Sequence, residues 1–176
     1  MLIPYCHTVQ YYETDQMAIV HHSNYIRWFE EARVDWFEQM GLPFAQIERM
    51  GIQIPVVSCA AKYHSSARFG EQVRIYLEKR AYNGVRLTVG YRVVDATDGT
   101  LRATGSSEHC FTDGAGRILN LRRRYPDQKD QKKHKTDRKA SLPEPQIFPV
   151  NRMIAALLSK QLTNLQACQL AVNPHS

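Results

Sequence analysis

One stretch decides the fold class of this 176-residue chain: NYIRWFEEARVDWFEQM, residues 24–40. Apolar side chains recur in it at three- and four-residue spacing, with charged side chains between them. They are Ile26, Phe29, Ala32, Trp36, Phe37 and Met40. This period predicts an amphipathic helix of roughly four turns. Ser23 or Asn24 is expected to cap its first turn, and Gly41 to end it.

The sequence after this helix is typical of an antiparallel sheet. A short second helix over residues 43–50 precedes four segments of strand character, which are residues 53–63, 72–82, 85–95 and 100–112. Links of a few residues around Asn83-Gly84 and Gly99 predict hairpin turns, because a parallel crossover needs a longer connection. Shorter strands are expected at residues 7–12 and 117–121. The sequence therefore predicts an α+β fold whose antiparallel sheet wraps one central helix.

The net charge of +6 comes from one part of the chain. Residues 122–139 hold nine basic and three acidic residues, which accounts for the whole excess, and the remainder is balanced at 14 basic and 14 acidic residues. We therefore expect a domain over residues 1–125, a basic, proline-containing linker over 126–149 and a C-terminal helix of unassigned role over 150–172. Because Tyr125 is the only aromatic residue near these charges, we expect no specific recognition of nucleic acid.

The composition also indicates where the protein works. No run of about 18 apolar residues predicts a transmembrane segment, and residues 1–8 lack the features of a secretory signal. The four cysteines, Cys6, Cys59, Cys110 and Cys168, have no paired spacing. We therefore expect a cytoplasmic protein without disulfides or a zinc site.

The loop before the long helix carries the residues best suited to catalysis. Asp15 precedes the helix, and His22 stands at its entrance. The amides and dipole of a helix N-terminus can hold a developing oxyanion, while a carboxylate attacks an acyl group or deprotonates water and a histidine assists. This pattern favours acyl transfer or hydrolysis. Asp15 could instead stabilise its own turn, and His22 could be a structural residue. A metal site is not expected, because the other histidines have no ligand-like spacing.

Residues 11–33 resemble the signature of the hotdog-fold thioesterases of the 4-hydroxybenzoyl-CoA thioesterase family, most closely their bacterial short-chain acyl-CoA branch. The resemblance rests on YYETD, six further residues and HSNYIRWFEEAR, and it continues to about residue 121, roughly two-thirds of the chain. It implies a hotdog fold and an acyl-CoA thioesterase that uses coenzyme A as part of its substrate and needs no other cofactor.

The resemblance also implies roles for individual residues. Asp15 takes the place of the catalytic carboxylate, as nucleophile or general base, and His22 that of an active-site histidine. Tyr11 or Tyr12 corresponds to an accessory tyrosine of the branch. Two departures, His21 for a usual aromatic residue and Ala18 for a common glycine, bear on substrate choice.

Several residues are candidates for substrate binding. Asn24 lies at the helix entrance, and basic residues flank the Asn83-Gly84 turn, where they could bind the phosphates of coenzyme A. The basic candidates are Lys79, Arg80 and Arg86, with Lys62 and Arg68 as further ones.

The family resemblance implies a homodimer or homotetramer, which would also cover a free edge of the sheet. A different hypothesis is a non-catalytic acyl-CoA-sensing module whose basic tail contacts a polyanionic partner. A sensor has no need of an ionisable Asp15 and His22 at the reaction position, so the sequence favours the enzyme. A hydratase on the same fold would need a different Asp/His pattern on the loop that leads into the helix, and the sequence shows no second Asp/His pair.

Overall fold

The computed structural model of the chain describes residues 2–125. The predicted linker over 126–149 and the predicted helix over 150–172 lie outside these described residues. The elements in chain order are β1 (Tyr5–Thr8), the 3-10 helix η1 (Tyr11–Glu13), α1 (Ser23–Gln39), α2 (Phe44–Arg49), β2 (Val56–Tyr63), β3 (Gln72–Tyr82), β4 (Arg86–Asp95), β5 (Leu101–Cys110) and α3 (Leu121–Arg124). No helix within residues 2–125 is long and apolar enough to cross a membrane.

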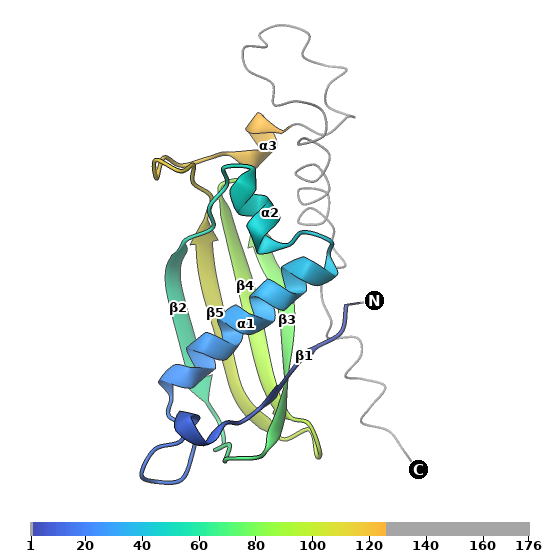
Figure 1. Cartoon of the computed structure of the whole chain (residues 1–176), viewed down its shortest axis with the longest axis vertical. Coiled ribbons are helices and arrows are strands. Elements are labelled where there is room, and N and C mark those ends of the chain that lie inside the picture. The colour runs from blue at the N-terminus through green and yellow to red at the C-terminus, as the bar shows by residue number, and fades with distance from the viewer. Residues whose placement is uncertain (1, 126–176) are drawn as a thin grey trace, which may run out of the picture.

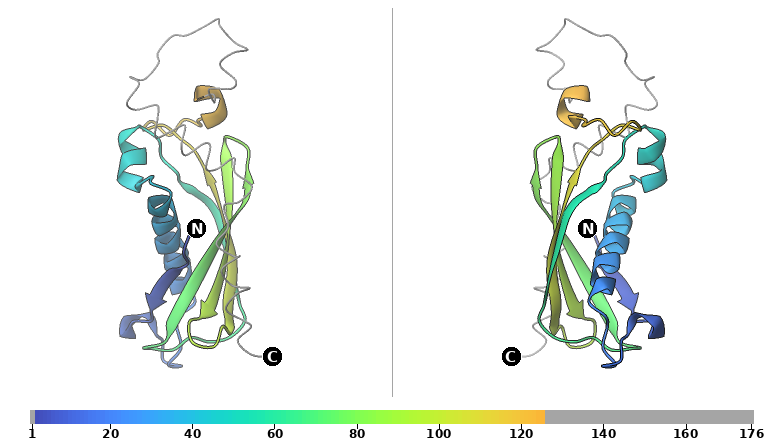
Figure 2. Two further views of the ribbon diagram at one scale, coloured as in Figure 1. Left: turned by 90° about the vertical axis from the view of Figure 1, so that its right-hand side faces the viewer. Right: turned by 90° about the vertical axis from the view of Figure 1, so that its left-hand side faces the viewer.

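The five strands form one antiparallel sheet in the order β1-β3-β4-β5-β2 (Figure 1). The long helix α1 lies across one face of it, so the molecule has a helical layer and a sheet layer (Figure 2). This arrangement confirms the predicted α+β fold with one central helix. The predicted bounds of 72–82 for β3 agree with the structure, because that strand is bordered on both sides by clear turn residues.

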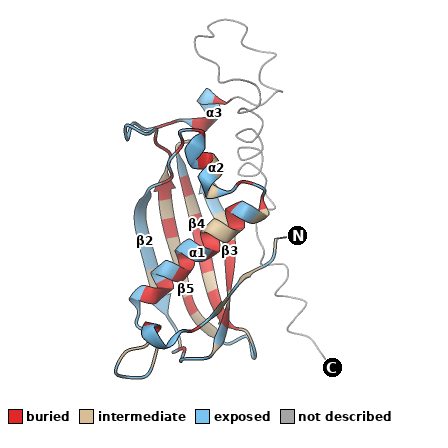
Figure 3. Ribbon diagram, viewed as in Figure 1, coloured by how far each residue is buried: buried red, intermediate tan, exposed pale blue. Residues whose placement is uncertain are grey.

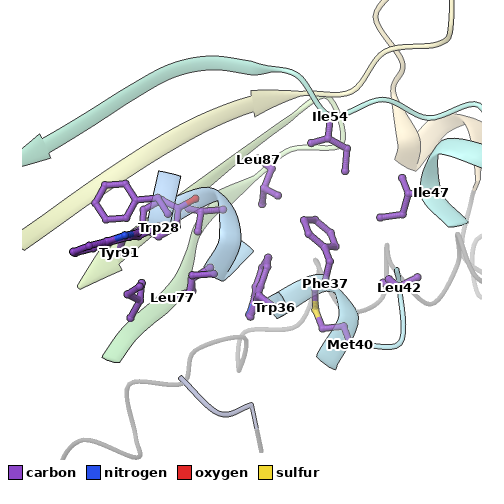
Figure 4. Close-up of a cluster of buried hydrophobic side chains, with 14 of the residues drawn as sticks. Trp28, Trp36, Phe37, Met40, Leu42, Ile47, Ile54, Leu77, Leu87 and Tyr91 are labelled. Atoms are coloured by element: carbon purple, nitrogen blue, oxygen red, sulfur yellow. The ribbon is translucent and has the colours of Figure 1, made fainter. Parts of the chain in front are cut away.

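The core lies between α1 and the sheet, and the second helix closes one end of it (Figure 4). Trp28, Trp36 and Phe37 of α1 are at most 1% exposed and meet Leu77 and Leu87 of the sheet layer. Burial of each such side chain contributes roughly 1.5–3 kcal/mol to the free energy of unfolding. The aromatic face of α1 therefore holds the helix on the sheet.

Phe29 packs closely against two strands of the sheet. Its ring stacks on Tyr91 of β4 with 4.4 Å between centroids. It also covers Gly105 of β5, where a Cβ atom would collide with the Phe29 ring and lie 2.8 Å from the carbonyl oxygen of Ala60. A residue without a side chain is therefore required at position 105.

The structure corrects two local predictions. The predicted strand over residues 7–12 is β1 followed by η1, because Glu13 accepts the Gln10 amide and closes a turn there. The predicted strand over 117–121 is reduced to one bridge between Thr112 and Ile118. Asn120 then caps the short helix α3 by accepting the Arg123 amide at 3.1 Å.

The helix α1 also differs from its prediction at its first turn. Neither Ser23 nor Asn24 caps it, since His22 occupies the capping position without a side-chain hydrogen bond. Ile26, predicted on the buried face, is 38% exposed, and Tyr25 and Trp28 are buried in its place. Both have aromatic bodies with one polar atom, which a simple apolar count undervalues.

β2 is an edge strand that the other residues between 2 and 125 cover poorly. It is exposed along nearly its whole length, whereas β3, β4 and β5 are mostly buried or partly buried (Figure 3). Val56 and Val57 are 54% and 47% exposed. β2 thus presents an apolar surface beside α1.

Candidate active site

The loop between η1 and α1 is a closed hairpin at the end of the molecule where β3 begins (Figure 1). Two hydrogen bonds link its two legs. His21 donates its amide to the Glu13 carbonyl at 2.8 Å, Asp15 donates its amide to the Ile19 carbonyl at 2.9 Å, and together they form the bridge between Thr14 and Val20. The loop therefore has a defined shape that places Asp15 on one leg and leads into His22 from the other.

Asp15 has a structural contact and a free oxygen. Its Oδ1 accepts the amide of Met17 at 2.8 Å, which is the turn interaction considered as the alternative to catalysis. Its Oδ2 accepts no hydrogen bond from the described residues, and the side chain is partly exposed. The structural role thus uses one oxygen and leaves the other available for chemistry.

His22 lies at the N-terminus of α1 with an exposed ring. This ring is next to those of His21 and Tyr63, with centroids 4.1 and 6.4 Å away. The Tyr63 hydroxyl donates to the His22 carbonyl at 3.0 Å. No acidic residue stands in the first turn of α1, so the positive end of the helix dipole is not neutralised from within the helix. Within residues 2–125, no hydrogen bond joins Asp15 to His22.

Asn24 faces the protein interior. Its side chain is 6% exposed, and its amide donates to the Glu13 carbonyl at 2.8 Å. The structure therefore places Asn24 beneath the loop, where it connects the loop to α1.

The Glu13 carboxylate is the other buried anchor of this region. It accepts hydrogen bonds from the Trp28 ring nitrogen and the Gln10 amide, both at 2.7 Å, and lies 2.9 Å from Nε2 of His7. Burial tends to raise the pKa of Glu13, but these hydrogen bonds outweigh it and keep the pKa below its usual value. The carboxylate is therefore ionised at neutral pH.

Exposed aromatic and apolar side chains surround the loop. Tyr11 and Tyr12 of η1 are 77% and 76% exposed, Met17 at the loop tip is 69% exposed, and Phe69 meets the Tyr11 ring edge-on at 5.6 Å. Arg68 donates to the Ala18 carbonyl at 3.2 Å. Of the basic candidates from the sequence, Arg68 thus contacts the loop that carries Asp15.

Of the four other basic candidates, Lys79, Arg80 and Arg86 lie at the opposite end of the sheet, because β3 runs away from the loop toward the β3–β4 turn (Figure 1). Lys62 lies next to Tyr63 at the end of β2. The eight steps along the strand from Gln72 to Arg80 span roughly 26 Å. Arg80 pairs with Glu78 at 2.8 Å, and Arg86 pairs with Glu108. Burial, followed by the charge of Arg122, lowers the pKa of Lys79. Within one chain, these residues do not meet Asp15.

A surface depression on the outer side of α1 holds none of the predicted site residues. It is lined by Tyr5, Arg27, Glu30, Glu31, Val34, Asp35 and Glu38. Four carboxylates against one guanidinium disfavour a substrate that carries phosphates. We therefore locate the candidate site at the loop and the N-terminus of α1.

Two residues of this site were not singled out from the sequence. Glu13 belongs to the recognised motif, but its burial is not visible in the sequence. Tyr63 contacts His22 from 41 positions away. Only the return of β2 to the N-terminus of α1 brings them together.

The fold and the loop together define a class, the hotdog-fold enzymes that hydrolyse thioesters. The chain belongs to the thioesterase-like superfamily, whose model matches residues 9–157. It is 32% identical over 120 residues to a candidate acyl-CoA thioesterase of Bacillus subtilis, YneP, across 68% of this chain and 86% of that protein.

Solved structures agree with this assignment. Protein TT1821 of Thermus thermophilus has a TM-score of 0.65 and 30% identity, across 85% of this chain and 97% of the other. The DHNA-CoA thioesterase of Staphylococcus aureus has a TM-score of 0.66 and 30% identity, across 72% of this chain and 85% of the other. The hotdog fold expected from the sequence is thereby confirmed.

Proposed function

We propose that this chain hydrolyses an acyl-CoA thioester to the free acid and coenzyme A, with Asp15 as nucleophile or general base. The observation that carries the proposal is the Asp15 carboxylate, which keeps one oxygen unengaged by the described residues. It lies on a loop that leads into the N-terminus of α1, where the capping residue His22 makes no side-chain hydrogen bond. The names of the Bacillus and Staphylococcus relatives support this class of substrate.

The reaction requires attack on the carbonyl carbon and donors for the oxygen that becomes negative. Asp15 either attacks the carbon, giving a mixed anhydride that water then cleaves, or takes a proton from the attacking water. In both cases the C–S bond breaks and the sulfur leaves as a thiolate that is then protonated. The positive end of α1 stabilises the oxyanion. Coenzyme A enters only as part of the substrate, and the scheme uses no cofactor or metal ion.

Other site residues have supporting roles in this scheme. His22 would assist by polarising or positioning the thioester, and Tyr63 holds its backbone in place. Tyr11 or Tyr12 would act as the accessory tyrosine. Both hydroxyls can reach solvent from η1, so either can approach a bound substrate.

The acyl group defines two candidate branches. The loop motif favours the 4-hydroxybenzoyl-CoA thioesterase family and its short-chain acyl-CoA branch. The Staphylococcus relative, named for DHNA-CoA, points to an aromatic acyl group instead. The exposed rings of Tyr11 and Phe69 beside the loop suit an aromatic group, because rings pack well edge-on.

The functional unit in this proposal is a homodimer or homotetramer in the cytoplasm. β2 has no partner strand on its outer side among the described residues, and its apolar surface suits pairing with β2 of a second copy. Antiparallel pairing would turn the far end of one sheet toward the loop of the other. Lys79, Arg80 and Arg86 would then approach the coenzyme A bound in the partner's site.

A panel of short-chain, medium-chain, benzoyl and hydroxynaphthoyl-CoA thioesters tests the proposal through thiol release by the purified protein. We expect hydrolysis of at least one class, with the panel deciding between the two branches. If none is cleaved while one binds, the protein is a sensing module and the proposed activity is wrong.

A further inference from the structure

Glu13 contacts three parts of the fold through its side chain. The carboxylate is buried, and it accepts the Gln10 amide within η1, contacts His7 of β1 and accepts the ring N–H of Trp28 of α1. These contacts join the start of the sheet to the central helix. A buried carboxylate is costly without such partners, so its place is specified by all three.

The backbone carbonyl of Glu13 is engaged at the same time. It accepts the amide of His21 and the side-chain amide of Asn24, each at 2.8 Å. The first bond closes the base of the catalytic loop, and the second joins that base to the first turn of α1. Glu13 therefore fixes the point from which both legs of the loop start.

Both candidate catalytic side chains are close to this point along the chain. Asp15 follows Glu13 by two residues on one leg, and His22 follows His21, the partner of Glu13, on the other. Asp15 has only the Met17 amide as a side-chain partner among the described residues, so its own contact joins it to the loop tip and not to the helix. Its position relative to α1 therefore depends on the base of the loop.

We propose that Glu13 is the positioning residue of the active site, holding the Asp15 loop at a fixed place against the N-terminus of α1. This inference rests on the proposed thioester hydrolysis at Asp15. Glu13 does not contact the substrate, and its effect is to keep the carboxylate at reacting distance from a thioester held by the helix. Small displacements of a reacting group are enough to slow catalysis by up to about 100-fold.

The test uses Glu13→Gln, which keeps the size of the side chain and removes its charge and one acceptor. Glu31→Gln is the matched control, because Glu31 also faces His7, at 3.5 Å, but is exposed and outside the loop base. We expect kcat of Glu13→Gln to fall about 10- to 100-fold with KM within about threefold. Glu31→Gln should stay within about twofold of the wild type in both.

The effect of Glu13→Gln is measured a second time in the Asp15→Asn variant, to distinguish a positioning role from a loss of fold stability. Because the reacting carboxylate is absent from Asp15→Asn, adding Glu13→Gln to it should lower the residual rate by less than about twofold. Thermal unfolding is measured on every variant, and rates are compared well below the lowest transition. A lower melting temperature with unchanged kcat, or equal losses in both backgrounds, would show that Glu13 is only structural.

If Glu13→Gln does not fold, Asn24→Ala tests the same loop base. It removes the amide that joins the Glu13 carbonyl to α1, and we expect a lower kcat with KM unchanged. A raised KM with unchanged kcat would instead make Asn24 a substrate contact and overturn the inference. A wild type that cleaves no thioester would refute the proposed function itself, whereas a fully active Glu13→Gln beside an inactive Asp15→Asn refutes only the positioning role.

Discussion

Ala18 has a backbone conformation that side chains disfavour. Its φ is +56°, and it is the only described residue other than glycine with a positive φ. The family resemblance implies a glycine at this position. The amide of Ala18 donates to the Asp15 carbonyl, so the strain is located in the turn that carries the candidate catalytic carboxylate.

We therefore expect Ala18→Gly to raise the free energy of unfolding by up to about 1 kcal/mol. The left-handed conformation costs a residue with a Cβ atom about 1–2 kcal/mol, and glycine avoids this cost but loses more conformational entropy on folding. Urea denaturation measures the change. Ala45→Gly, in the exposed part of α2, is the control and should lower stability by about 1 kcal/mol. Equal destabilisation by both substitutions would contradict the strain at Ala18.

His109 gives stability a pH dependence. It is fully buried, with its Nε2 2.7 Å from the Ser107 hydroxyl, and burial together with the nearby charge of Arg33 lowers its pKa to about 4. The folded protein thus holds His109 neutral, while the unfolded chain protonates it below about 6.5. The stabilisation is complete above pH 6.5 and is lost as the pH falls toward 4.

Between pH 7.5 and pH 5, this one group should lower the free energy of unfolding by about 2 kcal/mol. Denaturation curves measured across that pH range give the change of the free energy of unfolding with pH, and most of the range lies above the pH at which carboxyl groups titrate. His109→Gln should make the free energy of unfolding depend less on pH. His64→Gln, a substitution of an exposed histidine, should leave this pH dependence unchanged. An unchanged slope in His109→Gln would show that other groups cause the dependence.

The contact between α1 and β5 depends on the absence of a side chain at Gly105. Gly105→Ala should lower the free energy of unfolding by about 1–3 kcal/mol, because Phe29 or the strand must move to admit a Cβ atom. Gly114→Ala is the matched control, since nothing lies within 4 Å of a Cβ there. Its effect should stay within about 0.5 kcal/mol. If Gly105→Ala lowered the free energy of unfolding as little as Gly114→Ala does, α1 would be able to shift on the sheet to admit the added Cβ atom.

The same elements show what the sequence could and could not predict. The period of α1 and the turn residues around β3 are local signals, so both elements could be placed from sequence. The end of β1 could not be predicted from sequence, because it depends on the buried carboxylate of Glu13 and its contacts with His7 and Trp28. The strand expected over residues 117–121 failed for a related reason, since the side chain of Asn120 starts a helix instead.

For the site, the sequence predicted the loop but not its surroundings. Asp15 and His22 are close in the chain and belong to one motif, so the sequence was enough to predict that both lie where the loop meets the N-terminus of α1. Tyr63 reaches His22 only through the return of β2, and the distance of Arg80 from the loop depends on the direction of β3. Both are properties of topology, which residue spacing alone does not contain.

At the scale of the whole molecule, the edge strand β2 determines assembly in the proposed function. We expect the wild type to sediment as a dimer or tetramer, and Val57→Lys to shift it toward the monomer, because two-fold pairing of β2 brings like charges together. Activity should fall in parallel, since the partner completes the coenzyme A site. Thr97→Lys, on the exposed β4–β5 turn, should change neither. A Val57→Lys protein of unchanged mass would place the interface elsewhere.

The reaction assigned to the whole molecule depends on one carboxylate, so kcat of Asp15→Asn on the best acyl-CoA of the panel is the most direct measurement. The asparagine side chain retains an oxygen that can accept the Met17 amide, so the substitution preserves the turn. Asp98→Asn is the control for the same chemical change elsewhere, because the Asp98 carboxylate accepts the Thr100 amide at 2.8 Å in the β4–β5 turn. We predict a loss of about 100-fold or more for Asp15→Asn and less than about twofold for Asp98→Asn. A folded Asp15→Asn protein that retains wild-type kcat would contradict the role of Asp15 in catalysis.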